Sequence, residues 1–214
     1  MSSTKRSNSR EFHISDFYIT PQEPIKQFLE KFLSIETLSE HPSILEPSAG
    51  GNDKYDMPYP TVLKKLGINC NNLDTLDIRD NSKAYSRIDY LDSNVWSRYD
   101  LIITNPPFNL ALDFITKALD EVTFDGFVVM LLRLNFFGSQ SRKKFFAENM
   151  PKYCFVHSKR ISFFPEDVII PFFNKKKNKW EDKLYKKGST DSIEYAHFVW
   201  QKNYKQDYCK TYVI

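Results

Sequence analysis

The sequence lacks the features that mark membrane, zinc-binding and secreted proteins. In its 214 residues, no apolar run approaches the roughly 20 residues that a helix needs to cross a bilayer. Its three cysteines, Cys70, Cys154 and Cys209, lie far apart, without a C-x-x-C spacing or a nearby histidine pair. We therefore expect no metal site and no membrane contact, and the odd cysteine number is typical of a reducing compartment.

Glycine and net charge are also scarce. None of the six glycines forms the G-x-G-x-x-G fingerprint of dinucleotide-binding proteins, and no internal repeat is present. The formal net charge is only +3, which permits a polyanionic partner without requiring one. The length and the hydrophobic share of 41% suit one domain with a core, or one domain that carries a small insertion.

Positive charge gathers in two segments. Lys5, Arg6 and Arg10 lie within residues 1–15, where we expect a disordered basic arm rather than a secretory signal or an anchor. Residues 165–192 are rich in lysine, with aromatic side chains interleaved, and they separate two predicted strands. Loops of this length usually have a function or are disordered, so this insertion is either a target-recognition segment or a solvated loop.

Helical and extended patterns alternate along the rest of the chain. Between Thr20 and Leu38 apolar residues recur at three- and four-residue steps, which predicts a helix. Thr20 and Glu23 have the spacing of a capping box, and Pro21 suits the first helical position. Gly67 suits the C-cap of a second helix. Further helices are predicted at 59–66, 110–122 and 139–150, and strands at 43–46, 72–80, 87–91, 99–104, 126–134, 153–160 and 195–201. This alternation indicates an α/β fold with a mostly parallel sheet and helices on both faces.

Two unusual segments follow predicted strands of this sheet. They are EPSAGG at residues 46–51 and NPPF at residues 105–108. In parallel α/β sheets ligands bind beyond the carboxyl ends of the strands, so both segments should face one crevice. Small residues in the first segment let a ligand approach the backbone, and Glu46 adds an acidic group. Asp77 and Asp89 end the next two extended pieces, where an aspartate can bind a ribose diol or simply be solvated.

The NPPF segment suggests a specific chemistry. Its two prolines remove two backbone N–H donors and hold the chain extended, which leaves a rigid row of acceptors. The Asn105 side-chain oxygen and the Pro106 carbonyl could accept both hydrogens of a planar exocyclic NH2 group and so favour attack by its nitrogen lone pair. Phe108 offers a face for base stacking, worth roughly 1–3 kcal/mol. The alternative is an ordinary turn after a strand, with Phe108 in the core.

Together these segments resemble motifs of the S-adenosylmethionine-dependent DNA methyltransferases that methylate amino groups, in particular the small adenine-N6 enzymes of phages and prophages. DFYITP resembles their N-terminal cofactor motif, ILEPSAGG the glycine motif, RIDYL the adenine-binding motif and NPPF the catalytic tetrapeptide, in an order similar to that of the gamma group. The likeness runs from about Asp16 to the strand near His197. It implies a Rossmann-like class I methyltransferase domain over residues 16–214, with a seven-stranded sheet and an antiparallel C-terminal strand.

The resemblance also implies roles for single residues. Asn105, Pro106, Pro107 and Phe108 would be catalytic. S-adenosylmethionine would be the cofactor, bound by Tyr18, Thr20, Pro21, Glu46, Pro47, Ser48, Ala49, Gly50, Asp77, Asp89, Tyr90 and Asn105. Asp77 would hold its ribose and Asp89 its adenine amine, although a shifted register could put Asp74 or Asp80 in the place of Asp77. The glycine motif usually reads G-x-G, and this chain has Gly50, Gly51 and Asn52 instead, so the roles of Gly51 and Asn52 stay open.

The implied substrate is an adenine flipped out of double-stranded DNA. Nucleic-acid contacts are expected from Arg133, Asn135, Lys175, Lys176, Lys177 and Lys179. The implied location is the cytoplasm of a bacterium or of a phage-infected host. Similar tetrapeptides occur in methyltransferases that act on RNA bases and on glutamine in release factors, so these substrates are alternatives. A catalytically silent nucleic-acid-binding partner is a further alternative.

Overall fold

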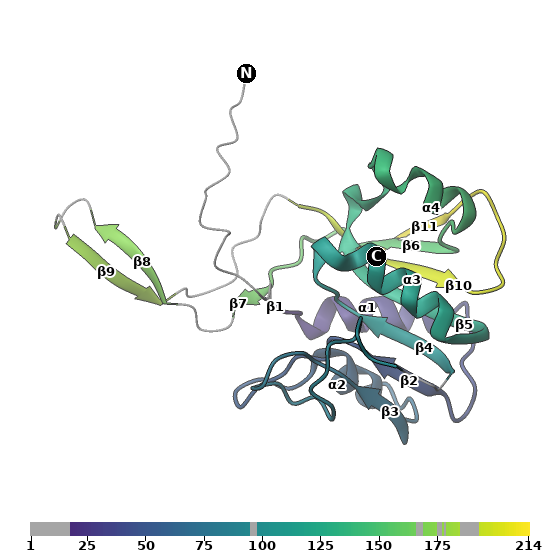
Figure 1. Cartoon of the computed structure of the whole chain (residues 1–214), viewed down its shortest axis with the longest axis horizontal. Coiled ribbons are helices and arrows are strands. Elements are labelled where there is room, and N and C mark those ends of the chain that lie inside the picture. Colours follow the sequence, from purple (N-terminus) through teal and green to yellow (C-terminus); the bar gives the residue numbers. More distant parts are fainter. Residues whose placement is uncertain (1–17, 95–97, 166–168, 175–176, 178, 185–192) are drawn as a thin grey trace.

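A computed structural model describes residues 18–94, 98–165, 169–174, 177, 179–184 and 193–214 (Figure 1). The basic arm predicted at residues 1–15 and the predicted contacts Lys175 and Lys176 lie outside the described residues. Among the helices of the described residues, none is long and apolar enough to span a membrane.

A seven-stranded sheet forms the centre of the fold, in the order β11-β6-β10-β5-β4-β2-β3. Neighbours among β3, β2, β4 and β5 pair in parallel, whereas β10 runs antiparallel to both β5 and β6. The mostly parallel α/β fold with an antiparallel C-terminal strand is thus confirmed. Its strands are β2 (Ser43–Glu46), β3 (Asn72–Thr75), β4 (Tyr99–Thr104), β5 (Val122–Arg133), β6 (Tyr153–Val156), β10 (Tyr195–Gln201) and β11 (Lys210–Val213).

Helices cover both faces of the sheet, because its central strands are apolar on both sides (Figure 1). In β4, Ile102 packs against α3, while Leu101 and Ile103 pack against the opposite pair of helices, α1 and α2. All three side chains are fully buried, and each such burial stabilises the fold by about 1.5–3 kcal/mol. The helices are α1 (Gln22–Leu33), α2 (Pro58–Lys65), α3 (Ala111–Glu121) and α4 (Lys143–Glu148), with short 3-10 turns at Phe108–Leu110, Leu134–Phe137 and Gln140–Arg142.

One predicted strand does not form. The 87–91 segment has no strand pairing, and an isolated bridge between Leu76 and Ser86 links the chain before it to the end of β3. A strand there would have Ile88 and Tyr90 on one face, but Ile88 is 47% exposed and only Tyr90 is buried. The seventh strand is instead β11, which pairs in parallel with β6 at the edge of the sheet.

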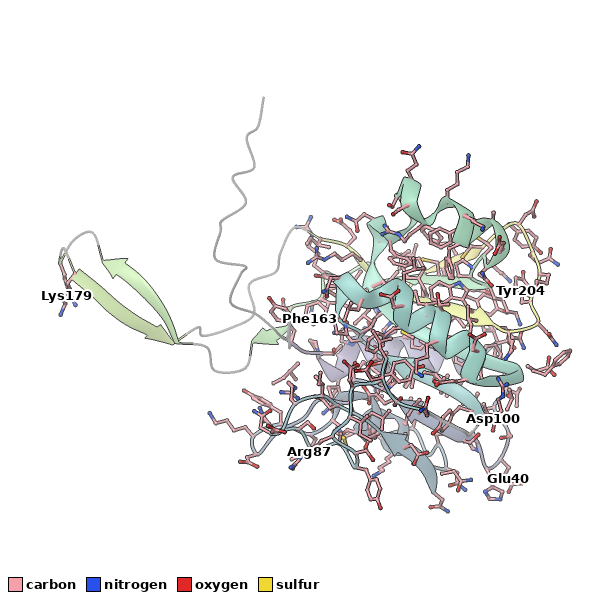
Figure 2. The ribbon with its side chains drawn as sticks, viewed as in Figure 1. Glu40, Arg87, Asp100, Phe163, Lys179 and Tyr204 are labelled. Atoms are coloured by element: carbon pink, nitrogen blue, oxygen red, sulfur yellow. The ribbon has the colours of Figure 1, made fainter. Side chains whose placement is uncertain are left out.

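The predicted insertion at residues 165–192 contains a β-hairpin that the sequence patterns did not indicate. Within the described residues, strands β8 (Ile169–Asn174) and β9 (Lys179–Leu184) pair with each other and with no other strand. Figure 1 shows them well apart from the seven-stranded body. Lys177 and Lys179 are exposed there, and Figure 2 shows Lys179 near the far end of the hairpin. Just before the hairpin, β7 (Phe164–Pro165) pairs antiparallel with β1 (Tyr18–Ile19).

The start of α1 differs from the predicted capping box. The helix begins at Gln22 with Pro21 at the N-cap, and no side chain caps it. The Thr20 hydroxyl instead accepts a hydrogen bond from the side chain of Asn105, which follows β4. In α2 the prediction holds, since Gly67 follows the C-cap with φ +77°.

Candidate functional site

A pocket opens where β2 and β4 end, between β1 and the chain that follows β3. The residues that line it come from segments that are far apart in the sequence. They are Tyr18, Ile19, Thr20, Glu46, Ser48, Ala49, Gly50, Gly51, Pro58, Tyr59, Asp77, Ile78, Arg79, Asn105 and Pro107. The two unusual segments therefore share one crevice, as their positions after parallel strands predicted.

Of the fifteen residues predicted to be catalytic or cofactor-binding, nine line this pocket and six do not. Those that line it are Tyr18, Thr20, Glu46, Ser48, Ala49, Gly50, Asp77, Asn105 and Pro107. Those outside its lining are Pro21, Pro47, Asp89, Tyr90, Pro106 and Phe108.

The loop after β2 needs both of its glycines. Gly50 and Gly51 have φ values of +67° and +71°, which residues with a side chain rarely adopt. A Cβ on Gly51 would also lie 3.0 Å from the Met57 side chain. Asn52 closes the loop, because its side-chain oxygen accepts the backbone N–H groups of Lys54 and Tyr55 at 2.9 and 3.0 Å. These contacts give Gly51 and Asn52 the structural roles that the sequence left open.

Asp77 is the acidic residue after β3 that reaches the pocket. Its carboxylate is 5% exposed and accepts the Gly50 N–H at 2.8 Å, so it fixes the glycine loop. Arg79 donates to it through its backbone N–H at 2.8 Å and its Nε at 3.1 Å. Asp74 is exposed and accepts the Tyr99 hydroxyl, and Asp80 is exposed too; neither lines the pocket. Arg79 was not predicted, although its position two residues after Asp77 is a usable signal for an ion pair.

Glu46 has a buried carboxyl oxygen that nothing binds. The residue is 1% exposed, and its Oε2 has no hydrogen-bond partner among the described residues. Burial, and then the charge of Asp77, raise the pKa of Glu46 well above its usual value. A buried acceptor without a partner is costly, and a hydrogen-bond donor or a cation in the pocket would remove that cost.

Tyr59 forms part of the pocket wall and was not predicted. Its hydroxyl lies 3.0 Å from His197 Nε2, and His197 Nδ1 lies 2.8 Å from His157 Nε2. The ring of His197 stacks on Phe28, with 4.1 Å between ring centres. This chain of contacts runs from the pocket into the core and holds the Tyr59 ring in place. Nothing in the local sequence marks a residue whose partner lies 138 positions away.

The side chain of Asn105 is bound at one end and free at the other. Its Nδ2 donates to Thr20 Oγ1 at 3.0 Å, whereas its Oδ1 is buried and has no partner among the described residues. Pro106 beside it is buried, and Pro107 lines the pocket. The strand end thus presents an unused acceptor next to the pocket, which is the arrangement that the NPPF chemistry requires.

Phe108 lies in an aromatic cluster next to this strand end. Its ring is partly buried, 5.8 Å from the ring of Tyr195, and the guanidinium carbon of Arg133 lies 4.9 Å from its centre. Phe163 packs edge-on against Tyr195 and also contacts Tyr18, and Figure 2 shows Phe163 at the side of the body that faces the hairpin. Arg133 Nε is buried without a partner in the described part of the chain.

The remaining predicted residues lie elsewhere. Tyr90 belongs to the core, and its hydroxyl donates to Glu121 Oε2 at 2.6 Å. Asp89 accepts the Leu91 N–H within a tight local turn. Asn135 is exposed in the 3-10 turn after β5. Asp89, Tyr90 and Asn135 are therefore not part of the pocket lining. Among the described residues, the hydrogen bonds of the Asp89 and Tyr90 side chains are made with Leu91 and Glu121.

No protein-family model matches the sequence, and no curated protein matches it. Several solved structures share its fold. A candidate class I S-adenosylmethionine-dependent methyltransferase from Listeria monocytogenes aligns with 92% of this chain and 65% of its own, with TM-score 0.55 and 14% identity. A candidate RNA methyltransferase from Pyrococcus horikoshii aligns over 87% and 88%, with TM-score 0.50 and 15% identity. The M protein of the type I restriction enzyme EcoKI aligns over 86% and 44%, with TM-score 0.51 and 14% identity. The chain thus has the Rossmann-like class I methyltransferase fold.

Proposed function

We propose that this protein transfers a methyl group from S-adenosylmethionine to the N6 amine of an adenine flipped out of double-stranded DNA. The observation that carries the proposal is the buried, unpartnered Oδ1 of Asn105 at the end of β4, beside the pocket. An acceptor in that position suits a planar NH2 group better than a hydroxyl or a carbon nucleophile, because each NH2 hydrogen needs an acceptor of its own.

The residues that line the pocket fit S-adenosylmethionine. The free Oε2 of Glu46 suits the ammonium or hydroxyl donors of such a ligand, and the glycine loop lets it approach the backbone. Asp77 accepts the N–H of Gly50 in that loop and lies in the pocket wall. When bound, the cofactor supplies an electrophilic methyl group on a positively charged sulfur. The lining of the described pocket does not support the proposed contacts of Asp89 and Tyr90 with the cofactor adenine, because neither residue is part of it.

In the proposed reaction the main task of the protein is to orient the target amine. Asn105 Oδ1 and the Pro106 carbonyl accept the two hydrogens of the target amine, which favours a pyramidal nitrogen with its lone pair directed at the methyl carbon. In the proposed transfer a nitrogen–carbon bond would form as the sulfur–carbon bond of the cofactor breaks, and the cofactor would leave without its methyl group. The amine becomes acidic once it is alkylated and gives its proton to water, so no strong base is required.

Residues outside the pocket suit a nucleic-acid substrate. Phe108 and Phe163 are only partly buried against the ring of Tyr195, and stacking of a base on such an aromatic ring is worth about 1–3 kcal/mol. The unpartnered Nε of Arg133 suits an acceptor of the target nucleotide, such as a phosphate oxygen. Lys177 and Lys179 of the projecting hairpin suit phosphates farther along the duplex. The chain spans only 44% of the EcoKI M protein and shares its fold alone. The DNA substrate is therefore part of this proposal.

RNA is the second candidate substrate. A fold neighbour of nearly equal length is a candidate RNA methyltransferase, and the acceptors at Asn105 and Pro106 suit the amines of RNA bases equally well.

One experiment separates these substrates. The protein is incubated with S-adenosylmethionine carrying a labelled methyl group and with plasmid DNA, total RNA or a protein extract, and the labelled products are digested and identified. We expect N6-methyladenine from DNA and no label with the Asn105→Ala variant. Label in RNA or in glutamine alone would move the proposal to that polymer, and no label in any of them would reject methyl transfer to an amine.

A further inference from the structure

We propose that Thr20 is a positioning residue that anchors the Asn105 amide, so that its oxygen stays available to the target amine; this inference rests on the proposed function of the same site. Thr20 does not itself touch the reacting atoms in this role. It acts through the hydrogen bond from Asn105 Nδ2 to its Oγ1, which joins two residues 85 positions apart at 3.0 Å.

The argument begins with the two ends of an amide. A primary amide carries two N–H donors at one end and an acceptor oxygen at the other, and the two ends have nearly the same shape. A half-turn of the amide would direct donors at the donors of the target amine, and the acceptor needed for transfer would be lost. A threonine hydroxyl can both accept and donate, and in this structure Thr20 Oγ1 accepts from the nitrogen end of the Asn105 amide. This contact anchors the amide and leaves Oδ1 buried beside the pocket, without a partner among the described residues.

Thr20 is buried at the start of α1 but does not cap that helix. The residue is 3% exposed and lies between β1, which pairs with β7, and Pro21, whose ring limits the backbone. Its spacing from Glu23 is that of a capping box, yet the helix starts without a side-chain cap. The Thr20 hydroxyl, which a capping box would use to accept a backbone N–H of the first turn of α1, accepts the side-chain N–H of Asn105 instead. A substitution at Thr20 therefore removes no cap from the helix.

The test compares two substitutions at this position. Thr20→Val keeps the branched shape and removes the hydroxyl, whereas Thr20→Ser keeps the hydroxyl. Methyl transfer is followed in a single turnover at saturating cofactor and substrate, so that changes in affinity do not enter the rate. We expect the valine variant to be about tenfold to a hundredfold slower, as for other losses of alignment at a reacting centre, and the serine variant to remain within about twofold of the wild type. Thr116→Val, on the exposed side of α3, is the matched control and should keep the full rate.

A second measurement does not depend on activity. The side-chain NH2 resonance of Asn105 is identified in nitrogen–proton NMR spectra by its absence from the Asn105→Ala variant. We expect this resonance to shift in Thr20→Val and to stay in place in Thr20→Ser. If the valine variant does not fold, Thr20→Ala replaces it in both measurements.

The outcomes separate this inference from the proposed function. If the wild type transfers methyl groups and Thr20→Val is equally fast, or if the Asn105 resonance does not move, the positioning role is rejected while the proposed function stands. If the wild type transfers nothing, the proposed function fails, and the NMR comparison still decides whether Thr20 holds the Asn105 amide. A slower valine variant with a shifted resonance, together with a normal serine variant, supports the positioning role.

Discussion

Asn105 combines a satisfied nitrogen with an unsatisfied oxygen, and this asymmetry leads to a prediction about rate and affinity. Asn105→Ala removes an acceptor that is used mainly in the transition state, so we expect methyl transfer to fall by about 10²–10³-fold. Cofactor affinity, measured by calorimetry, should stay within about threefold because the pocket keeps its acidic and glycine residues. Asn109→Ala, four residues on and exposed, should retain the wild-type rate. Equal activity of the Asn105 variant would contradict the mechanism.

Glu46 leads to a prediction about pH. Because burial and then the charge of Asp77 raise the pKa of Glu46 well above its usual value, Glu46 takes up a proton at a higher pH than a solvated glutamate does, and a positively charged ligand must displace that proton. We therefore expect S-adenosylmethionine to bind more tightly as the pH rises towards that pKa, and the affinity to level off above it. Calorimetry in buffers of different ionisation enthalpy should detect the released proton. Glu46→Gln should abolish both effects, and Glu40→Gln, on an exposed residue, should change neither.

At the scale of structural elements, the irregular chain between β3 and β4 is anchored by a buried contact rather than by strand pairing. Tyr90 donates to Glu121 at 2.6 Å, and Lys117 lies 3.0 Å from the other oxygen of that carboxylate. We expect Tyr90→Phe to lower the free energy of unfolding by about 1.5–3 kcal/mol, the usual worth of a hydrogen bond to a charged group. Urea denaturation measures this change. Tyr85→Phe is the matched control because Tyr85 is 90% exposed and its loss should cost nothing measurable.

The elements that the sequence predicted correctly are those whose own side chains determine them. The apolar run of β4 and the periodic apolar positions of α1 depend on local pattern, and both elements form where expected. The edge strand β11 depends on pairing with β6, which lies far away in the sequence, and the strands of the hairpin β8–β9 have only a weak apolar pattern. Neither was therefore predicted. Thr20 shows the same limit of local patterns. Its hydroxyl was predicted to cap α1, but it binds the side chain of Asn105, 85 positions away.

The candidate site divides in the same way. Glu46 ends β2, Asp77 lies two residues after β3 and Asn105 follows β4 directly. Parallel strands bring their carboxyl ends together, so the meeting of these residues in one pocket could be predicted. Tyr59 reaches the pocket from the first turn of α2, and its orientation is fixed by His197 on β10. Sequence spacing carries no information on such a contact. Asp89 was expected at a strand end, and it lies outside the pocket lining because no strand forms around it.

For the molecule as a whole, the buried histidines predict a loss of stability in acid. Burial lowers the pKa of His157 from 6.5 to about 4, and burial, followed by the charge of His157, lowers the pKa of His197 well below its usual value. The unfolded chain therefore binds more protons than the folded one below pH 6.5, and stability falls as the pH drops from there to about 4. For His157 the loss is about 3 kcal/mol, from 1.4 kcal/mol per pH unit.

Urea unfolding of two variants at several pH values checks this prediction. His157→Gln should show a smaller difference between pH 7 and pH 4 than the wild type, because glutamine does not titrate. His41→Gln is the control, since His41 is exposed and its removal should leave the pH profile unchanged. A profile for His157→Gln that parallels the wild type would mean that other groups cause the acid loss.

The projecting hairpin predicts how binding to DNA depends on salt. Each lysine that neutralises a phosphate contributes about −0.9 to the slope of log affinity against log salt concentration. We expect the double variant Lys177→Gln with Lys179→Gln to flatten that slope by about 2, whatever the DNA sequence. Lys26 and Lys31, on α1, provide a control pair for the loss of two positive charges. A slope equal to that of the wild type would exclude the two hairpin lysines from phosphate contact.

The pairing of β1 with β7 has a consequence for the exchange of ligand with solvent. These strands pair over two residues each and only with one another, outside the seven-stranded sheet. Parting them breaks few hydrogen bonds and requires far less free energy than unfolding the sheet. The amide of Ile19 should therefore exchange its hydrogen through local opening, whereas the amides of Ile102 and Ile103 in β4 should exchange only when the whole domain unfolds. Since Tyr18 and Ile19 line the pocket, a bound molecule can leave it on the time scale of that local opening, while the rest of the chain stays folded.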